Sequence, residues 1–152
     1  MSEIGHRNLI LSGPPKGGEK YREGWIFLAH NGLIVLGDDL ANAKFAGIGR
    51  RIAYPSRPPE TDMDIILDNT DGPDGVPVQV ADGIRYEPAV TYDRRGPYIL
   101  KAVGTVPQIG NKAYVGGADA FTVDPASIGF ANSIEMGTVW EHRPNGYYLV
   151  DF

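Results

Sequence analysis

The densest group of side chains that could hold a metal ion or act as acids and bases is a run of aspartates between residues 62 and 74. Its members are Asp62, Asp64, Asp68, Asp71 and Asp74. An EF-hand calcium loop needs glycine at its sixth position and glutamate at its twelfth. Counted from Asp68, these positions hold Pro73 and Gln79. The spacing excludes an EF-hand and leaves two readings open, a solvated acidic loop or an irregular calcium-binding loop.

The other possible catalytic groups do not form a recognisable site. The glycine-rich stretch 13–20 has Glu19 where a nucleotide-binding P-loop has lysine followed by serine or threonine. No serine stands in a Gly-x-Ser-x-Gly context, and the three histidines are far apart in sequence. Glu135 and Glu141 could act as an acid–base pair on a sugar, but two acids on a β scaffold are more often solvated. We therefore expect no enzyme activity, no catalytic residue, no metal and no cofactor.

Composition limits the class of protein further. The chain has 152 residues and no cysteine, which excludes disulfides, thiolate metal sites and cysteine nucleophiles. Its formal charge of −5 and sequence pI of about 5.1 disfavour a general nucleic-acid or anionic-membrane surface. Its apolar runs are too short for a signal peptide or a membrane span. These features predict a soluble protein that is made in the cytoplasm.

Short β-type runs separated by turn residues predict the fold class. The turns Asn31-Gly32, Asp82-Gly83 and Pro144-Asn145-Gly146 each separate two such runs, as in β-hairpins. About ten strand candidates follow one another with turn signals every 8–12 residues, roughly the spacing of a barrel or sandwich. We expect an all-β protein, a compact antiparallel β-barrel or sandwich, with residues 21–152 as one domain and residues 55–75 as a Pro/Asp-rich surface excursion.

Several local elements can also be placed. Residues 38–46 have an acidic start and predict one short helix, and residues 124–132 predict a connector with one helical turn. Residues 98–106 read as one long strand, and runs at 104–109 and 112–115 flank an Ile-Gly-Asn corner. In the last strand, alternation places Tyr147 and Leu149 on the wetter face and Tyr148 and Val150 in the core.

Residues 1–20 predict an extended N-terminal arm. Its one strand-like run is Leu9 to Leu11, and the Gly-Pro-Pro stretch after it resists helix and regular sheet. Such an arm can be a plain first strand of its own domain, or it can add to the edge of a neighbouring chain's sheet.

The order of motifs resembles the capsid decoration, or cement, proteins of tailed bacteriophages. The likeness covers about residues 24–152. It rests on 45–48 (Phe-Ala-Gly-Ile), 78–84 (Val-Gln-Val-Ala-Asp-Gly-Ile), 109–115 (Ile-Gly-Asn-Lys-Ala-Tyr-Val), and the closing stretches 136–139 and 148–152. The chain departs from the family pattern in the excursion 55–75 and in the longer stretch 86–97.

The resemblance implies a protein without a cofactor that binds the outer surface of the assembled major capsid protein lattice and stabilises the capsid. It also implies a virion protein, made in the host bacterial cytoplasm, that self-associates as a homotrimer or homodimer. The predicted capsid-facing residues are Ile4, His6, Arg7, Asn8, Leu9, Ile10, Arg50, Arg51 and Arg57. The alternative is a carbohydrate- or receptor-binding β module of a phage tail or virion, which needs an exposed aromatic platform.

Overall fold

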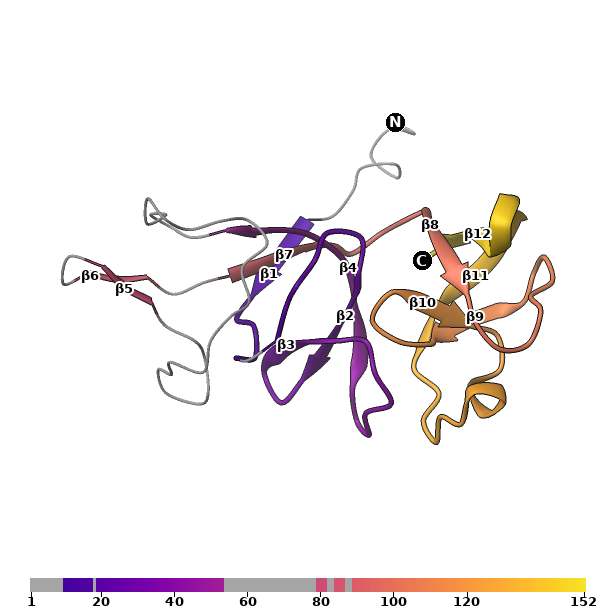
Figure 1. Ribbon diagram of the computed structural model, residues 1–152, viewed down its shortest axis with the longest axis horizontal. Coiled ribbons are helices and arrows are strands. Elements are labelled where there is room, and N and C mark those ends of the chain that lie inside the picture. The colour runs from indigo at the N-terminus through magenta and orange to yellow at the C-terminus, as the bar shows by residue number, and fades with distance from the viewer. Residues whose placement is uncertain (1–9, 18, 54–78, 82–83, 87–88) are drawn as a thin grey trace, which may run out of the picture.

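The computed structural model describes residues 10–17, 19–53, 79–81, 84–86 and 89–152, with side chains described outside 51–88. The twelve strands of these described residues form a five-stranded sheet, a closed five-stranded barrel and a two-stranded hairpin (Figure 1). This architecture confirms the predicted all-β class. Nearly all neighbouring strands are antiparallel, and β8 with β10 is a parallel pair. No helix in the described part of the chain is long and apolar enough to cross a membrane.

The five-stranded sheet, called the first lobe below, has the order β1-β7-β4-β2-β3. Its strands are β1 (Ile10–Gly13), β2 (Ile26–His30), β3 (Leu33–Leu36), β4 (Lys44–Ala53) and β7 (Ala89–Asp93). The barrel, called the second lobe, has the order β10-β8-β12-β11-β9. Its strands are β8 (Tyr98–Ala102), β9 (Lys112–Val115), β10 (Ala120–Thr122), β11 (Glu135–His142) and β12 (Tyr147–Asp151). The hairpin consists of β5 (Gln79–Ala81) and β6 (Ile84–Tyr86).

The chain after β1 crosses to the opposite edge of the first lobe. The backbone amide of Lys16 donates to the carbonyl of Ile34, and the amide of Ile34 donates to the carbonyl of Pro14. Beneath this crossing the Tyr21 hydroxyl lies 2.7 Å from the Ile34 carbonyl oxygen and 3.0 Å from that of Lys16. Burial raises the pKa of Tyr21, which keeps the phenol neutral and able to donate. The sheet thus encloses a core of its own, formed by Tyr21, Phe27, Ile34, Ala46, Val90 and Tyr92.

The two lobes share a second, larger core. In β2, Phe27 points into the first lobe, whereas Ile26 and Leu28 point the opposite way and pack with barrel residues. The barrel contributes Leu100, Ala113, Val115, Phe121, Ile134, Met136, Val139, Tyr148 and Val150 to this core. Because successive side chains of a strand alternate between faces, a strand buried on both faces must be apolar throughout. The continuous Ile-Phe-Leu run of β2 meets this requirement.

The predicted hairpins are present. Asn31 and Gly32 both have positive φ between β2 and β3, as a type I′ turn requires. Strands β5 and β6 pair on either side of residues 82–83. Asn145 and Gly146, which also have positive φ, connect β11 and β12. The expected helical turn in the connector is a 3₁₀ turn at Pro125–Ile128.

The helix predicted over residues 38–46 is wrong. The chain turns at Ala41 and Asn42, where Asn42 has a φ of 63°, and β4 then begins at Lys44. Phe45 and Ile48 are needed in the shared core, and they reach it from a strand paired with β2. Asp39, expected near a helix N-terminus, instead accepts hydrogen bonds from the amides of Ala131 and Asn132. Tertiary pairing has overridden the local capping signal.

Two other boundaries differ from the expectation. Strand β8 ends at Ala102, and the residues from 103 to 111 form a loop rather than a strand. Residues 10–13 of the expected arm form β1, which pairs with β7 of the same chain from Ile10↔Asp93 to Gly13↔Val90. For these residues the plain first-strand reading is the correct one.

Candidate functional site

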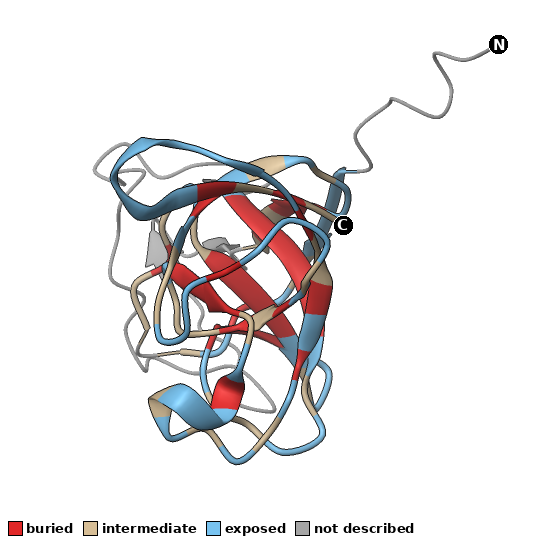
Figure 2. Cartoon of the chain, turned by 90° about the vertical axis from the view of Figure 1, so that its right-hand side faces the viewer, coloured by how far each residue is buried: buried red, intermediate tan, exposed pale blue. Residues whose placement is uncertain are grey.

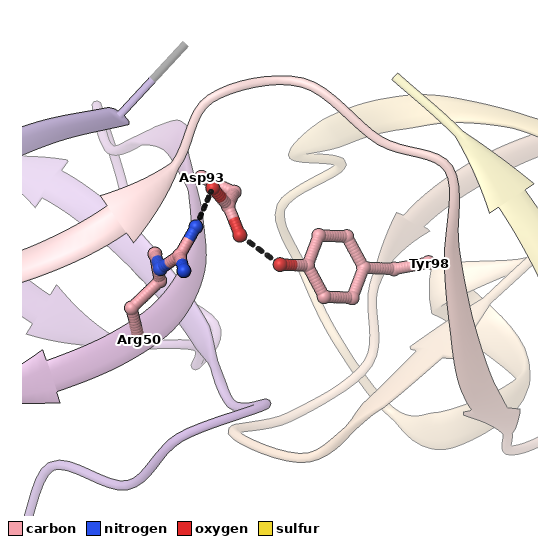
Figure 3. Close-up of polar contacts among 3 residues, drawn as sticks. All are labelled: Arg50, Asp93 and Tyr98. Atoms are coloured by element: carbon pink, nitrogen blue, oxygen red, sulfur yellow. Dashed lines mark hydrogen bonds and ion pairs between the residues drawn. The ribbon is translucent and has the colours of Figure 1, made fainter. Parts of the chain in front are cut away.

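A buried carboxylate lies where the two lobes meet (Figure 3). Asp93 is 1% exposed, and its Oδ1 atom lies 3.0 Å from a guanidinium nitrogen of Arg50. Its other carboxylate oxygen accepts a hydrogen bond from the Tyr98 hydroxyl. Arg50 belongs to β4 in the first lobe, whereas Tyr98 begins β8 in the second. The Asp93 carboxylate therefore links a cation of one lobe to a phenol of the other.

The strand order explains this arrangement. Asp93 is the last residue of β7, which lies between β1 and β4 in the sheet. Only residues 94–97 separate it from Tyr98, so the first residue of the barrel is held close to the end of β7. The amide of Gly96 in this connection also donates to the carbonyl of Phe152 over 3.1 Å. Phe152 in turn stacks on the Tyr98 ring, with centroids 6.0 Å apart.

The contacts of Asp93 join the two lobes. A buried carboxylate is costly unless it is paired, and here each oxygen has a partner. The three groups provide one ion pair and one hydrogen bond. Within the described residues, no group of three or more His, Asp or Glu side chains is placed to hold a metal ion. The arrangement holds the lobes in one orientation.

Among the described residues, most of the exposed large apolar side chains belong to the second lobe. We call this set the barrel band: Ile99, Val106, Ile109, Trp140 and Tyr147. Ile99 of β8 pairs with Leu149 of β12, which pairs with Glu141 of β11, the neighbour of Trp140. The amide of Gly110, next to Ile109, donates to the carbonyl of Val139, next to Trp140. The pairing thus places Ile99, Trp140 and Ile109 on adjacent segments.

Trp140 occupies an irregular position in its strand. The register of β11 on β12 shifts between Val139 and Glu141, and Trp140 is the extra residue there. Such a β-bulge re-aims a side chain. The Trp140 side chain is 56% exposed, whereas Val139 beside it is fully buried. Figure 2 shows the molecule from the barrel side, with buried strand segments inside and exposed loops around them.

A second exposed apolar surface lies on the first lobe. Ile10 and Leu11 are 52% and 39% exposed, and we call these residues the β1 edge. Strand β1 is the terminal strand of its sheet and pairs only with β7 among the described strands. Unpaired backbone groups on a terminal strand can accept another extended chain. The β1 edge and the barrel band therefore lie on different lobes of the molecule (Figure 1).

Two of the residues predicted from the sequence to face a partner, Ile10 and Arg50, both contact Asp93. Ile10 pairs with Asp93, the same residue that binds the Arg50 guanidinium. Arg50 is therefore occupied within its own chain, although its side chain is still 43% exposed. Arg51 lies in β4, and its side chain is outside the described residues. The remaining predicted positions, Ile4, His6, Arg7, Asn8, Leu9 and Arg57, and the aspartates at 62–74 also lie outside them.

Sequence reasoning missed part of the barrel band. Val106 and Ile109 were expected to belong to strand-like runs, but they belong to an exposed loop. Pro107 and Gly110 within this stretch were the available signal, because proline removes a ladder donor and glycine marks turns. The exposure of Tyr147 and the burial of Tyr148 and Val150 agree with the predicted alternation.

Searches of the chain against protein-family models, curated proteins and solved structures gave no match. The case for function therefore depends on the residues and surfaces described above.

Proposed function

We propose that this chain is a capsid decoration protein of a tailed bacteriophage, which binds the outer surface of the assembled major capsid protein lattice and stabilises it. One observation carries the proposal: two exposed apolar surfaces, the β1 edge and the barrel band, lie on different lobes that share one core. A protein that clamps neighbouring subunits needs two contact surfaces held at a fixed separation. Its task requires rigidity and no chemistry.

The separation between the two surfaces is supported by the shared core and by the Asp93 junction. Ile26, Leu28 and Phe45 of the first lobe are buried among barrel residues, so the lobes do not move as independent bodies. Many copies bound side by side on a lattice gain avidity, and each contact can then be individually weak. The sequence resemblance to decoration proteins points in the same direction. The partners on this proposal are the major capsid protein and further copies of the chain.

Cosedimentation with expanded, undecorated capsids of the phage that encodes the chain tests this proposal. The unmodified protein should bind a saturable number of sites on the capsid. Trp140→Ser in the barrel band and Leu11→Ser in the β1 edge should each weaken binding by at least about tenfold, because apolar anchors dominate protein interfaces. Glu23→Gln is the matched control, since Glu23 is exposed and lies in neither surface. Absence of binding by the unmodified protein would refute the proposal.

The residues predicted to face the capsid can be tested in the same assay. Deletion of residues 1–9 removes Ile4, His6, Arg7, Asn8 and Leu9 but keeps β1, which belongs to the sheet. A loss of capsid affinity with an unchanged unfolding midpoint would assign a contact to this segment. Unchanged affinity would show that the β1 edge and barrel band are sufficient.

A second candidate function is favoured by Trp140 and Tyr147, which are exposed aromatic residues on one barrel wall. Aromatic rings with a polar handle suit sugar faces as well as protein surfaces. On this alternative, the chain is a carbohydrate- or receptor-binding module of a virion. Binding of the isolated protein to a glycan array, abolished by Trp140→Ser, would support it.

A further inference from the structure

An open depression of about 410 Å³ lies beside the junction of the lobes, and its described lining residues belong to neither the β1 edge nor the barrel band. It is lined by the start of β4, by Arg94 of the connection between lobes, and by the start of β11. Phe45, Ile134 and Met136 are its buried apolar residues, whereas Lys44, Arg94, Ser133 and Glu135 are exposed. The depression therefore combines an apolar base with a polar rim.

The rim carries two positive charges without a carboxylate partner. Among the described residues, no carboxylate oxygen lies within ion-pair distance of Lys44 or Arg94. Glu135 is the acidic residue of the rim, and its carboxylate lies 3.5 Å from the Lys112 ammonium. The local balance is consequently positive, although the whole chain has a formal charge of −5. A positive rim on an acidic protein favours an anionic occupant.

Arg94 has donors left for such an occupant. One guanidinium nitrogen donates to the carbonyls of Phe45 and Ala46, at 3.1 and 3.2 Å. The register of β4 on β2 shifts here, because adjacent Phe27 and Leu28 pair with Gly47 and Phe45. Ala46 is therefore a bulged residue without a partner in β2. A guanidinium has five N–H groups, so the remaining ones can bind both oxygens of a carboxylate.

The same place has room for a short peptide. Residues 44–47 of β4 pair with β2, whereas pairing with β7 on the other side begins only at Ile48. Beyond that point no strand pairs with this edge of β4 in the described part of the molecule, and the Arg94 guanidinium holds the carbonyls of Phe45 and Ala46 there. A peptide can lie in the open depression against Arg94, with one side chain over Phe45 and Met136.

We propose that this depression binds a short peptide segment in which an apolar side chain is followed by an aspartate or glutamate. The apolar side chain occupies the base formed by Phe45, Ile134 and Met136. The carboxylate binds the Arg94 guanidinium and the Lys44 ammonium at the rim. This peptide site is separate from capsid binding by the two apolar surfaces. The result of its test does not depend on whether the chain binds capsids.

The test uses ¹⁵N-labelled full-length protein titrated with two acetylated pentapeptides, Gly-Leu-Asp-Leu-Gly and Gly-Leu-Asn-Leu-Gly. The aspartate peptide should shift the backbone amide signals of Lys44, Phe45 and Glu135. The asparagine peptide should bind about tenfold more weakly, because it lacks the charge that strengthens hydrogen bonds to arginine and lysine. Equal affinity for the two peptides, or no shift at millimolar concentrations of the aspartate peptide, would overturn the proposal.

Matched variants locate the carboxylate. Arg94→Gln and Lys44→Gln should each weaken binding of the aspartate peptide about tenfold. Arg95→Gln should leave it unchanged, since Arg95 is an exposed neighbour that does not line the depression. Arg94→Gln also removes the donors to the carbonyls of Phe45 and Ala46, and this loss can unfold the variant. If Arg94→Gln does unfold, the affinity of Lys44→Gln for the aspartate peptide tests the site instead. An equal loss in Arg95→Gln and Lys44→Gln would contradict the site.

Discussion

At the scale of single residues, the buried Asp93 carboxylate depends on its hydrogen-bond partners. It is almost fully buried, and it uses Arg50 and Tyr98 to replace the water that it loses on folding. Truncating one partner of a buried charged group leaves part of its desolvation uncompensated. The stability of the connection between the lobes should therefore respond to the loss of a single hydroxyl.

Tyr98→Phe removes that hydroxyl while keeping the aromatic ring that stacks on Phe152. We expect the free energy of unfolding to fall by about 1–3 kcal/mol, measured by urea denaturation. The matched control is Tyr147→Phe, because Tyr147 lies in the exposed barrel band. It should change stability by less than about 0.5 kcal/mol. Equal changes in the free energy of unfolding for the two substitutions would show that the hydrogen bond from Tyr98 to Asp93 does not stabilise the fold.

Asp39 predicts how stability depends on pH. The Ala131 amide, followed by the Asn132 side chain, lowers the pKa of Asp39 from its ordinary value of 3.8. A depressed folded-state pKa means that the stabilisation is present above the unfolded-state pKa and is lost as pH falls through the folded-state value. Asp39→Asn should therefore lower the urea midpoint at pH 7, and this difference should shrink below about pH 4.

The control for this pH dependence is Asp119→Asn, at an exposed aspartate. Its urea midpoint should follow that of the unmodified protein across the whole pH range. A difference between Asp39→Asn and the unmodified protein that stays constant down to pH 2 would contradict the role given to the Asp39 carboxylate.

At the scale of elements, close approach between strands fixes where side chains are tolerated. A Cβ atom added at Gly47 would collide with the backbone carbonyl of Asp93 and lie 2.7 Å from a ring carbon of Tyr92. A Cβ atom added at Gly13 would meet only the Ile34 side chain, with its nearest atom 2.9 Å away. Backbone in a paired strand cannot move aside as a side chain can.

Gly47→Ala should therefore destabilise the protein by more than Gly13→Ala. Overpacking of this kind costs about 1–3 kcal/mol, and we expect the upper end for Gly47 and the lower end for Gly13. Thermal unfolding followed by near-ultraviolet circular dichroism measures both. The reverse order would mean that β4 and β7 are not packed as closely as the pairing of Ile48 with Asp93 requires.

Local turn chemistry was sufficient to predict several elements from the sequence. Asn31-Gly32 and Asn145-Gly146 have the positive φ values that their residue types favour, so these hairpins form where expected. The stretch 38–46 failed because its acidic residues signal a helix start locally, whereas Phe45 is required in the shared core. Long-range pairing of this kind leaves no local signal.

The candidate site was predictable only in part, for a related reason. Ile10 was correctly placed on a strand, but its pairing with Asp93 could not be read from residues separated by more than half of the chain. Arg50 was expected to meet carboxylates of a partner, and the structure gives it a carboxylate of its own chain. The barrel band was hidden because exposure of Val106 and Ile109 depends on the path of the loop.

At the scale of the whole molecule, we propose that two contact surfaces are held on one rigid body. The shared core and the Asp93 junction join the lobes, the β1 edge lies on one lobe, and the barrel band lies on the other. A bridge of this kind transmits tension between its two contacts only if the lobes do not separate. Tyr98→Phe should therefore weaken capsid stabilisation more than it weakens capsid binding.

Heating of decorated capsids measures that difference. Capsids saturated with Tyr98→Phe should release their DNA at a lower temperature than capsids saturated with the unmodified protein. Occupancy is matched in the two samples by raising the concentration of the variant. Identical release temperatures at equal occupancy would mean that the Asp93 junction does not contribute to capsid stabilisation.

Cryo-electron microscopy of capsids decorated with the unmodified protein shows whether the molecule bridges two capsid subunits. We expect each copy to span two neighbouring capsid subunits, with the β1 edge against one and Trp140 of the barrel band against the other. Density in which each copy contacts a single subunit through one lobe, or capsids that remain bare, would contradict it.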